Sequence, residues 1–559
     1  MPDPAHAHPV RRLLQTLAAR HLRHLAVSAL TVWLGACTML GPDFVPPQTT
    51  LPTAWGEQST ASSRARAAYW WRLFNDPLLD LLVARAYQQN LTLEAAGLRI
   101  LQARAALGIA DALVFPQQQT LSGSAARTFS RDQTLSSLQL GFDVGWEMDV
   151  WGKYARGIES AEAALYASVA SYDDILISIT AEVARNYINW RTAQERLLLS
   201  EQNIQIQQRV VEITQLQFDS GNVTELDVQQ ALTQLNSTQA VMPALRTTRA
   251  QARNALAVLL GLLPEQLDAL LQAQDTNLTK PIDKWERASG DLTMTSAPGE
   301  AYHAYTFVPE APQLNLQVSA DLLQRRPDIR VAELQARAQS ARIGLTKADL
   351  YPQFLLFGNI GFSQTVARGE AFTGRDALGI SLGPAFSWNI FNYGRIKNQV
   401  RVEDARFQES LSNYNQTVLS AVQEVANALV AYDNTRQTKE FDSLSVQSAV
   451  RAFSISLTQY QNGLVNYQRL LSTVEKMTVN EDRYAQAKGN VALQVVALYK
   501  ALGGGWQMRS GKPFVSADIK ATMRERTDWG NYLDVPPAVN TLPAVDTLPA
   551  AAPAEPAAP

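Results

Sequence analysis

The chain has few of the residues from which most catalytic and metal sites are built. Cys37 is its only cysteine in 559 residues, which excludes a disulfide framework and a cysteine-based zinc site. Four of its five histidines lie within the first 24 residues, and His303 is the only histidine further along. A histidine cluster in the main body is therefore excluded. We expect no metal, no cofactor and no enzyme activity.

The sequence also has neither a strong charge of one sign nor a long hydrophobic run. The formal net charge is −3, so no basic field favours a nucleic-acid partner. The apolar run from Leu25 to Leu34 is shorter than the about 20 residues of a membrane-spanning helix. Basic residues precede this run, among them Arg11 and Arg12, and the combination is typical of an export signal.

The only cysteine stands where this apolar run stops. Leu34-Gly35-Ala36-Cys37 resembles a bacterial lipobox, in which signal peptidase II cuts before the cysteine and the cysteine then carries lipid. We therefore predict a signal peptide over 1–36 and lipidation of Cys37. Thr38 follows instead of aspartate, which favours the outer membrane. A plain secretory leader with an incidental cysteine is the alternative interpretation.

Proline is missing from two long stretches, 117–242 and 385–512. Apolar residues recur within them at the helical spacing of three and four. We predict α-helices over 154–218, 225–260, 396–460 and 467–502. The second of them runs past Pro243, where we expect a kink or a join between two stacked segments. A helix of about 65 residues is about 100 Å long. Gly221 and Gly463 end the two long helices, as glycine often does, so each half is a helical hairpin that needs packing partners.

The two halves of the chain are copies of each other. Trp146 to Lys153 matches Trp388 to Arg395 at an offset of 242, and Gly221 matches Gly463 at the same offset. One offset held over more than a hundred residues indicates a duplicated half-domain, because solenoid units have about 20–50 residues.

An earlier segment repeats at a slightly different offset. Gly108 matches Gly344 and Pro116 matches Pro352, both at 236. The change from 236 to 242 places six additional residues in the second copy, between Pro352 and Trp388.

The stretches that precede the long helices have the pattern of β-strands. Apolar residues alternate with polar or small ones from Leu138 to Trp146, and again from Leu378 to Trp388. This period of two predicts strands over about 119–147 and 354–390, two in each half. They fit either a sandwich sheet or a membrane barrel with polar residues toward a lumen. Small lumen-side residues and the terminal tryptophans favour the barrel.

Four strands are too few to close a membrane barrel, which has at least about eight. No sheet edge is left open in lipid. If the strands form a barrel, several chains must therefore build it together.

We divide the chain into seven parts and assign it a mainly α fold with a transmembrane β-barrel. Each half contains two strands and a long helical hairpin. The parts are a signal peptide (1–36), a lipidated tether (37–68), a first repeat (69–261), an equatorial connector (262–315), a second repeat (316–503), an equatorial C-terminal segment (504–535) and a disordered Pro/Ala-rich tail (536–559). Within the connector we expect a helix from Pro264 to Gln274.

Taken together, these features resemble the TolC superfamily of outer-membrane efflux ducts, and in particular its lipid-anchored branch of OprM, CusC and NodT-type proteins. The resemblance is carried by the lipobox at Cys37, the opening Trp70-Trp71 to Pro77, the helix ends at Gly221 and Gly463, and the specific motif Asp321-Leu322-Leu323-Gln324-Arg325-Arg326-Pro327-Asp328-Ile329-Arg330. We assign Arg325, Arg326 and Asp328 a structural role in helix-start capping and inter-subunit salt links.

The resemblance implies a homotrimer in the outer membrane of a Gram-negative bacterium, in contact with outer-membrane lipid. Its twelve strands would form one barrel and its twelve hairpin helices a periplasmic tunnel. Such a duct is a passive exit for drugs or other small molecules. An inner-membrane pump, of the RND type in this branch, delivers them through a periplasmic adaptor protein.

The resemblance also implies two kinds of site residue at the hairpin ends. The turns that match the adaptor-contacting tips are Gly221, Asn222, Val223 and Thr224, and Gly463, Leu464, Val465 and Asn466. The tunnel closes near these ends, at positions matching Asp227 in the first copy and Gln468, Arg469 and Ser472 in the second. Several relatives have acidic residues at the second set, so this sequence departs from a simple ring of carboxylates. The alternative interpretation of each tip residue is that the glycine only caps a helix and the polar turn is exposed to solvent.

A second function fits part of the sequence: a periplasmic coiled-coil scaffold lipoprotein without a pore. It explains Cys37 and the long helices but leaves the four alternating segments unexplained. A heat-resistant β signal in a purified outer-membrane fraction separates the two functions. A lipid-tethered secreted enzyme is disfavoured, because only His303 remains after removal of the leader.

Overall fold

The computed structural model describes most of the predicted repeats. The described residues are 39–47, 67–131, 133–274, 285–288, 291–294, 307–314, 325–368, 370–374 and 377–534. The predicted signal peptide, Cys37, much of the tether and connector, and the tail 536–559 lie outside these residues.

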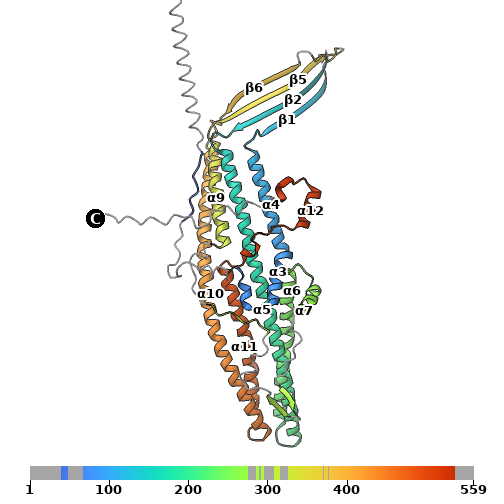
Figure 1. Ribbon diagram of the computed structural model, residues 1–559, viewed down its shortest axis with the longest axis vertical. Coiled ribbons are helices and arrows are strands. Elements are labelled where there is room, and N and C mark those ends of the chain that lie inside the picture. Colours follow the sequence, from blue (N-terminus) through green and yellow to red (C-terminus); the bar gives the residue numbers. More distant parts are fainter. Residues whose placement is uncertain are drawn as a thin grey trace, which may run out of the picture.

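Two long helices of equal length dominate the molecule. α5 (Lys153–Asp219) and α10 (Arg395–Gln461) have 67 residues each. They turn back into α6 (Glu225–Leu259) and α11 (Tyr467–Ala501), with 35 residues each. Every boundary lies within one residue of the prediction. Figure 1 shows both hairpins pointing to the end of the molecule opposite the sheet.

Shorter helices complete each half. η1 (Trp70–Phe74) and α3 (Pro77–Gln89) precede α4 (Leu91–Ala112), and α9 (Pro327–Ala348) is the copy of α4 at offset 236. The carboxylate of Asp76 caps α3 by accepting from the backbone N–H groups of Leu78 and Leu79, at 3.0 and 3.2 Å. The predicted start of this helix is therefore confirmed.

The helices form one layer in which short helices are stacked on the return helices. Near the sheet the order across the layer is α4, α5, α9, α10; near the hairpin ends it is α6, α5, α11, α10. The Asn90 side chain, at the start of α4, donates to the Leu259 carbonyl at the end of α6, at 2.8 Å. The equivalent joint in the second half is made by Arg326, which donates to the Ala501 carbonyl at 2.6 Å.

The main core lies at the level of these joints. Trp70 and Trp71 of η1 are buried there with Tyr187 and Ile188 of α5. The ring of Trp70 stacks on Tyr499 of α11, with centroids 5.8 Å apart and planes 7° apart. This core also contains Ala67, so the end of the predicted tether packs into the body of the protein.

The sheet lies beyond one end of the helices (Figure 1). Its order is β1 (Gln118–Phe129), β2 (Thr134–Met148), β5 (Gln353–Ala367), β6 (Leu378–Ser387), and all neighbours are antiparallel. Four residues connect β1 to β2, whereas ten connect β5 to β6. This difference accounts for the six additional residues of the second copy.

The register sorts the sheet into alternating rows. Leu121, Phe142, Ile360 and Ile380 stand opposite one another across all four strands, and Thr120, Asp143, Asn359 and Ser381 form the next row. The Asn359 amide donates to the Asp143 carboxylate at 2.5 Å. Because side chains alternate between faces, one face is apolar and the other polar. The outer strands β1 and β6 have no further partner in the sheet as described.

Tryptophans connect the sheet to the helices in the same way in both halves. The Trp146 indole donates to the Val114 carbonyl and the Trp388 indole to the Leu350 carbonyl, both at 3.0 Å. Val114 and Leu350 are related by the offset of 236. The predicted tryptophans therefore lie at one end of the strands.

The remaining elements belong to the connector and the C-terminal segment. They are α7 (Pro264–Gln274), as predicted, β3 (Trp285–Ala288), β4 (Asp291–Met294), η2 (Trp506–Arg509), α12 (Ala517–Arg526) and η3 (Gly530–Leu533). α12 lies beside α4 (Figure 1), and Met523 and Leu533 are buried against Leu101. Among the described helices none is alone long and apolar enough to cross a membrane; α6 and α7 meet that test only as a bent pair.

Candidate functional site

The first hairpin end is a tight turn built on one glycine. Gly221 has φ of +75°, a left-handed conformation that glycine adopts without strain. Its N–H donates to the Phe218 carbonyl at 2.8 Å, and the N–H of Asn222 donates to the Gln217 carbonyl at 2.9 Å. This pair of bonds is a Schellman motif. It ends α5 and reverses the chain within the predicted tip.

The return helix of this hairpin starts with a capping box. The Asp227 carboxylate accepts from the backbone N–H and from the hydroxyl of Thr224, at 2.9 and 2.8 Å. The Asp227 N–H in turn donates to the Thr224 carbonyl at 3.1 Å. Asp227 is half-buried, and its negative charge is stabilised at the N-terminus of α6.

The second hairpin end repeats the turn but changes the charge. Gly463 has φ of +69°, and the Leu464 N–H donates to the Gln459 carbonyl at 2.8 Å. The Asn466 side chain caps α11 by accepting from the N–H of Arg469, at 3.3 Å. Arg469 stands at the position of Asp227 and is exposed. The two equivalent positions therefore carry opposite charges.

Aromatic packing closes the second hairpin end, and a hydroxyl contact links this end to the first hairpin. The rings of Tyr460 and Tyr467 meet edge to face at 6.0 Å, and the Tyr460 hydroxyl lies 3.4 Å from the Thr214 hydroxyl of α5. Burial raises the pKa of Tyr467, and the negative charge of Asp227 adds to this shift. Asp227 therefore lies within electrostatic reach of the second hairpin.

The predicted site residues thus gather at one end of the molecule. Gln468 and Arg469 are exposed, and Ser472 is half-buried one turn further along α11. Leu464 at the tip has 74% of its surface exposed, and Leu226 in the first turn of α6 has 64%. A single chain brings these residues to one end of the molecule (Figure 1). It does not by itself close a ring around an axis.

Buried ion pairs stabilise the middle of the molecule. Among the described ones, only the ion pairs of Arg326 involve a motif that the sequence presents. Glu195 of α5 pairs with Lys488 of α11, and it accepts from the N–H groups of Phe307 and Val308 at 3.2 and 3.3 Å. Its carboxylate therefore attaches the connector to the helices. No local pattern distinguishes Glu195 from the many exposed glutamates of these helices.

Arg326 and Asp328 of the motif at 325–330 have a structural role at the start of α9, although Arg326, the N-cap residue, makes no side-chain capping bond. Arg326 is 7% exposed and donates to Asp328 and to Glu424 of α10, at 2.7 and 2.8 Å, besides the Ala501 carbonyl. The Asp328 carboxylate also accepts from the Ile329 N–H at 2.9 Å. The inter-subunit salt links expected for this motif stay a prediction.

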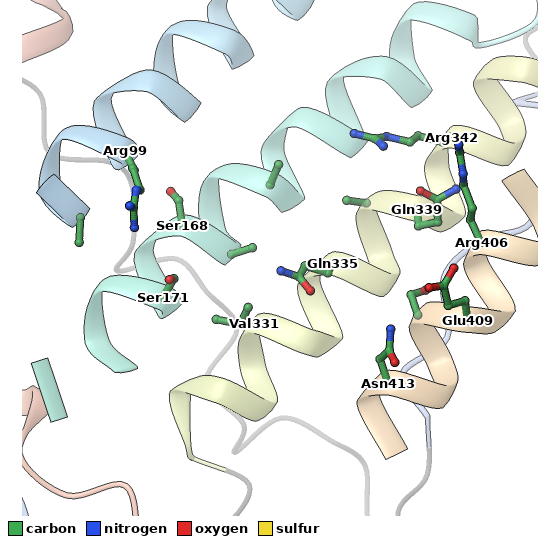
Figure 2. A pocket seen from close by; sticks show the side chains of 15 residues that line it. Arg99, Ser168, Ser171, Val331, Gln335, Gln339, Arg342, Arg406, Glu409 and Asn413 are labelled. Carbon is green, nitrogen blue, oxygen red and sulfur yellow. The ribbon is translucent and has the colours of Figure 1, made fainter. Parts of the chain in front are cut away.

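The helical layer contains a cavity that is lined by small, amide and charged side chains. It has a volume of about 620 Å³ and lies where α4, α5, α9 and α10 meet. Figure 2 shows Arg99 on one side, Arg342 and Arg406 on the other, and Glu409 along α10. Arg406 is paired with Glu403 at 2.9 Å. The other lining residues are mostly alanine, serine and amide side chains, without histidine or cysteine.

One short string has the form of a hydrolase motif. Gly379-Ile380-Ser381-Leu382-Gly383 reads Gly-x-Ser-x-Gly, which in hydrolases forms a sharp turn between a strand and a helix. Here it lies wholly within strand β6, paired along β5. No nucleophile elbow forms at this string, and no group of three or more potential metal ligands occurs in the described part of the chain.

Comparison with known proteins agrees with this arrangement. The family model "outer membrane efflux protein" matches residues 82–262 and 318–504, which are the two repeats. The chain belongs to the outer membrane efflux protein family. The resemblance found in the sequence is therefore confirmed, and so are the outer-membrane localisation and the role as a component of an efflux system.

Individual members of this family match over most of their length. Nodulation protein T of Rhizobium leguminosarum bv. viciae is 29% identical over 490 residues, covering 87% of this chain and 94% of the relative. The pyoverdine export outer membrane protein OpmQ of Pseudomonas putida is 28% identical, covering 87% of this chain and 98% of the relative. The family and the solved structures that resemble this chain are channel proteins.

A solved structure confirms the fold. The outer-membrane channel OprN superposes with a TM-score of 0.70 at 29% identity, covering 84% of this chain and 100% of that chain. CusC superposes with a TM-score of 0.69 at 22% identity, which supports the fold alone. The predicted TolC-like architecture of the outer membrane efflux proteins is therefore present in this chain.

Proposed function

We propose that three copies of this chain form the outer-membrane exit duct of a tripartite efflux system. The observation that carries this proposal is the four-stranded sheet with two unpaired outer strands, β1 and β6, among the described residues. Unpaired backbone groups are not tolerated in lipid, and a membrane barrel needs at least about eight strands. Three sheets joined edge to edge give one closed barrel of twelve strands.

The two faces of the sheet support this arrangement. The row Leu121, Phe142, Ile360 and Ile380 is substantially exposed in the single chain, and in a barrel it would face lipid. The row that contains Asp143 and Asn359 would face a water-filled lumen. This alternation is that of a membrane barrel. A periplasmic scaffold without a pore does not explain it.

The helical layer is also incomplete as a single copy. Its edge helices are α10 on one side and α4 with α6 on the other. Large apolar side chains are exposed on these helices: Leu419, Val430 and Phe441 on α10, and Val241 and Val258 on α6. A neighbouring copy would cover them. Three layers would give a tunnel of twelve helices below the barrel.

The partners follow from this assembly and from the relatives. A periplasmic adaptor protein would contact the turns 221–224 and 463–466, and an inner-membrane pump, of the RND type, would deliver the cargo. Relatives include pyoverdine, solvent and toluene efflux proteins, which favours small molecules as cargo. Lipidation of Cys37 would attach each copy to outer-membrane lipid, as in the probable outer membrane lipoprotein SilC, which is 25% identical.

We place the periplasmic gate at Asp227, Gln468, Arg469 and Ser472. Because Asp227 and Arg469 stand at equivalent positions, a trimer would present three carboxylates and three guanidinium groups at one level. Opposite charges at short range attract, so the closed state would be held by ion pairs instead of by a ring of like charges.

Single-channel recording in a planar bilayer, combined with light scattering of the purified lipidated protein, tests this proposal. We expect a trimer with a small and rarely open conductance. Arg469→Ala or Asp227→Ala should increase the open fraction, whereas Arg436→Ala, an exposed change higher on α10, should not. A monomer without conductance would contradict the duct and favour the scaffold.

A further inference from the structure

The short segment Met39–Asp43 is bound to the main body by several specific contacts. The Leu40 N–H donates to the Trp151 carbonyl at 3.2 Å. The Arg156 guanidinium donates to the Leu40 carbonyl at 3.1 Å and to the Asp43 carboxylate at 2.7 Å. Arg156 is only 2% exposed, although its partner Asp43 lies at the surface. The segment therefore covers a buried arginine.

Glycines make room for this segment on both sides. Gly41 has φ of +95°, and a Cβ there would lie 2.5 Å from the Gly344 Cα. A Cβ on Gly344 would overlap the Leu40 carbonyl oxygen. Gly152 has φ of +69°, and a Cβ there would lie 2.8 Å from Met39 Cγ. Side chains at these positions would prevent the approach of the two backbones.

This binding place lies at the seam between the two halves of the chain. Gly152 and Arg156 belong to the first half, at the start of α5, and Gly344 belongs to the second half, near the end of α9. β2 leads into α5 and α9 leads into β5, and these two strands are the central pair of the sheet. The segment thus sits directly beneath the junction of the halves.

The second half does not build an equivalent place for a chain segment. Asn398 stands where the first half has Arg156, and Gly394, the counterpart of Gly152, has open space around its Cβ position apart from the Asn398 side chain. Of the three residues, only Arg156 is replaced in the other copy. Gly152 and Gly344 have glycine counterparts, Gly394 and Gly108, but only Gly152 and Gly344 face the backbone of the N-terminal segment.

We propose that Met39–Asp43 is a docking arm, and that Gly152, Arg156 and Gly344 form its socket. The docked arm holds the start of α5 against the end of α9 beneath the sheet. The docking does not depend on the lipidation proposed above for Cys37, which precedes Met39 by two residues in the sequence.

Hydrogen exchange measured by mass spectrometry on the purified full-length mature protein tests the docking. In Gly344→Ala the added methyl group collides with the arm, so we expect exchange in the peptide containing Leu40 to rise about tenfold or more. Gly157→Ala is the matched control, since a Cβ there meets only the Leu345 side chain, at 3.5 Å. Both changes replace a helical glycine by alanine, which by itself favours the helix. Equal exchange of the arm in the two variants would overturn the proposal.

A second variant tests the role of the arm at the seam without adding bulk. Arg156→Gln removes the charge that holds Leu40 and Asp43, and it should release the arm and accelerate exchange in the peptides spanning 153–157 and 340–348. Adding Gly344→Ala to this variant should then have little further effect on the arm, because the two changes break the same docking. Slow exchange at 340–348 in Arg156→Gln would overturn the role at the seam.

Two further measurements separate this inference from the proposed function. Intact mass reports whether Cys37 carries lipid, and conductance reports whether the protein is a duct. If either fails while Gly344→Ala still releases the arm, the docking stands and the duct or the anchor is wrong. If the duct conducts but Gly344→Ala leaves the arm protected, the docking is wrong and the proposed function stands.

Discussion

Replacing Arg326 by alanine should strongly destabilise the joint between the two stacked helices of the second half. The guanidinium of Arg326 donates to the Ala501 carbonyl at 2.6 Å, to Asp328 at 2.7 Å and to Glu424 at 2.8 Å. This one side chain therefore connects α9, α11 and α10. Its removal takes a charged donor away from the end of α11.

The magnitude follows from the exposure of each partner. The side chains of Asp328 and Glu424 are 29% and 56% exposed, so together they contribute about 1 kcal/mol or less. The bond to the buried Ala501 carbonyl involves a charged donor and contributes about 1.5–3 kcal/mol. We therefore expect Arg326→Ala to lower the free energy of unfolding by about 2–4 kcal/mol.

The matched control is Arg330→Ala, one turn further along α9. Arg330 is half-exposed and forms one ion pair with Glu333, at 2.7 Å and three residues away, which contributes about 0.3–0.5 kcal/mol. Thermal unfolding of both variants in the same detergent, followed by far-UV circular dichroism, compares them. If Arg326→Ala unfolds at the same temperature as Arg330→Ala, the joint is not held by this arginine and the estimate is wrong.

Three further changes test other parts of the structure. Burial raises the pKa of Asp174, and the charge of Asp328 adds to the shift. The folded state therefore binds the proton of Asp174 more tightly than the unfolded state does. The free energy of unfolding should consequently fall as the pH rises from about 4 through the folded pKa. Asp174→Asn should raise the unfolding temperature at neutral pH and remove this dependence, and a lower unfolding temperature would contradict the burial argument. Gly463→Ala should destabilise the second hairpin end by about 1 kcal/mol, because the backbone is left-handed there. No neighbouring atom meets the new Cβ, so backbone strain is the only cost. Thermal unfolding measures this loss, and an unchanged midpoint would contradict it. Asp227→Ala should cost about 1 kcal/mol through loss of the capping box, measured as faster hydrogen exchange in the first turn of α6 alone.

The sequence predicted the helical part of the fold closely because its signals are local. Proline-free stretches, helical spacing of apolar residues and the glycines at 221 and 463 fix where each long helix begins and ends, and the second copy repeats the same signals. The strands were located by their alternation. Closure into a barrel stays a proposal, since it depends on contacts between chains.

The contacts that hold the parts together were harder to predict because they depend on tertiary approach. Residues 37–68 have the composition of an extended tether, yet Met39–Asp43 is docked and Ala67 is buried in the main core. Arg156 carries no sequence signal that separates it from the exposed arginines of the same helices. Arg326 was found only because it lies within a specific motif.

The duplicated glycines show why equivalent positions in a repeat acquire different roles. Gly108 and Gly344 occupy the same place in α4 and α9, and each faces a segment from one end of the chain. Gly108 faces the hydroxyl end of the Tyr532 side chain, whereas Gly344 faces the Leu40 backbone. A side chain can rotate away from a new methyl group, but a backbone held by Arg156 and Trp151 cannot do so without leaving its site. Glycine is therefore required more strictly at Gly344, although the sequence presents the two positions as equal.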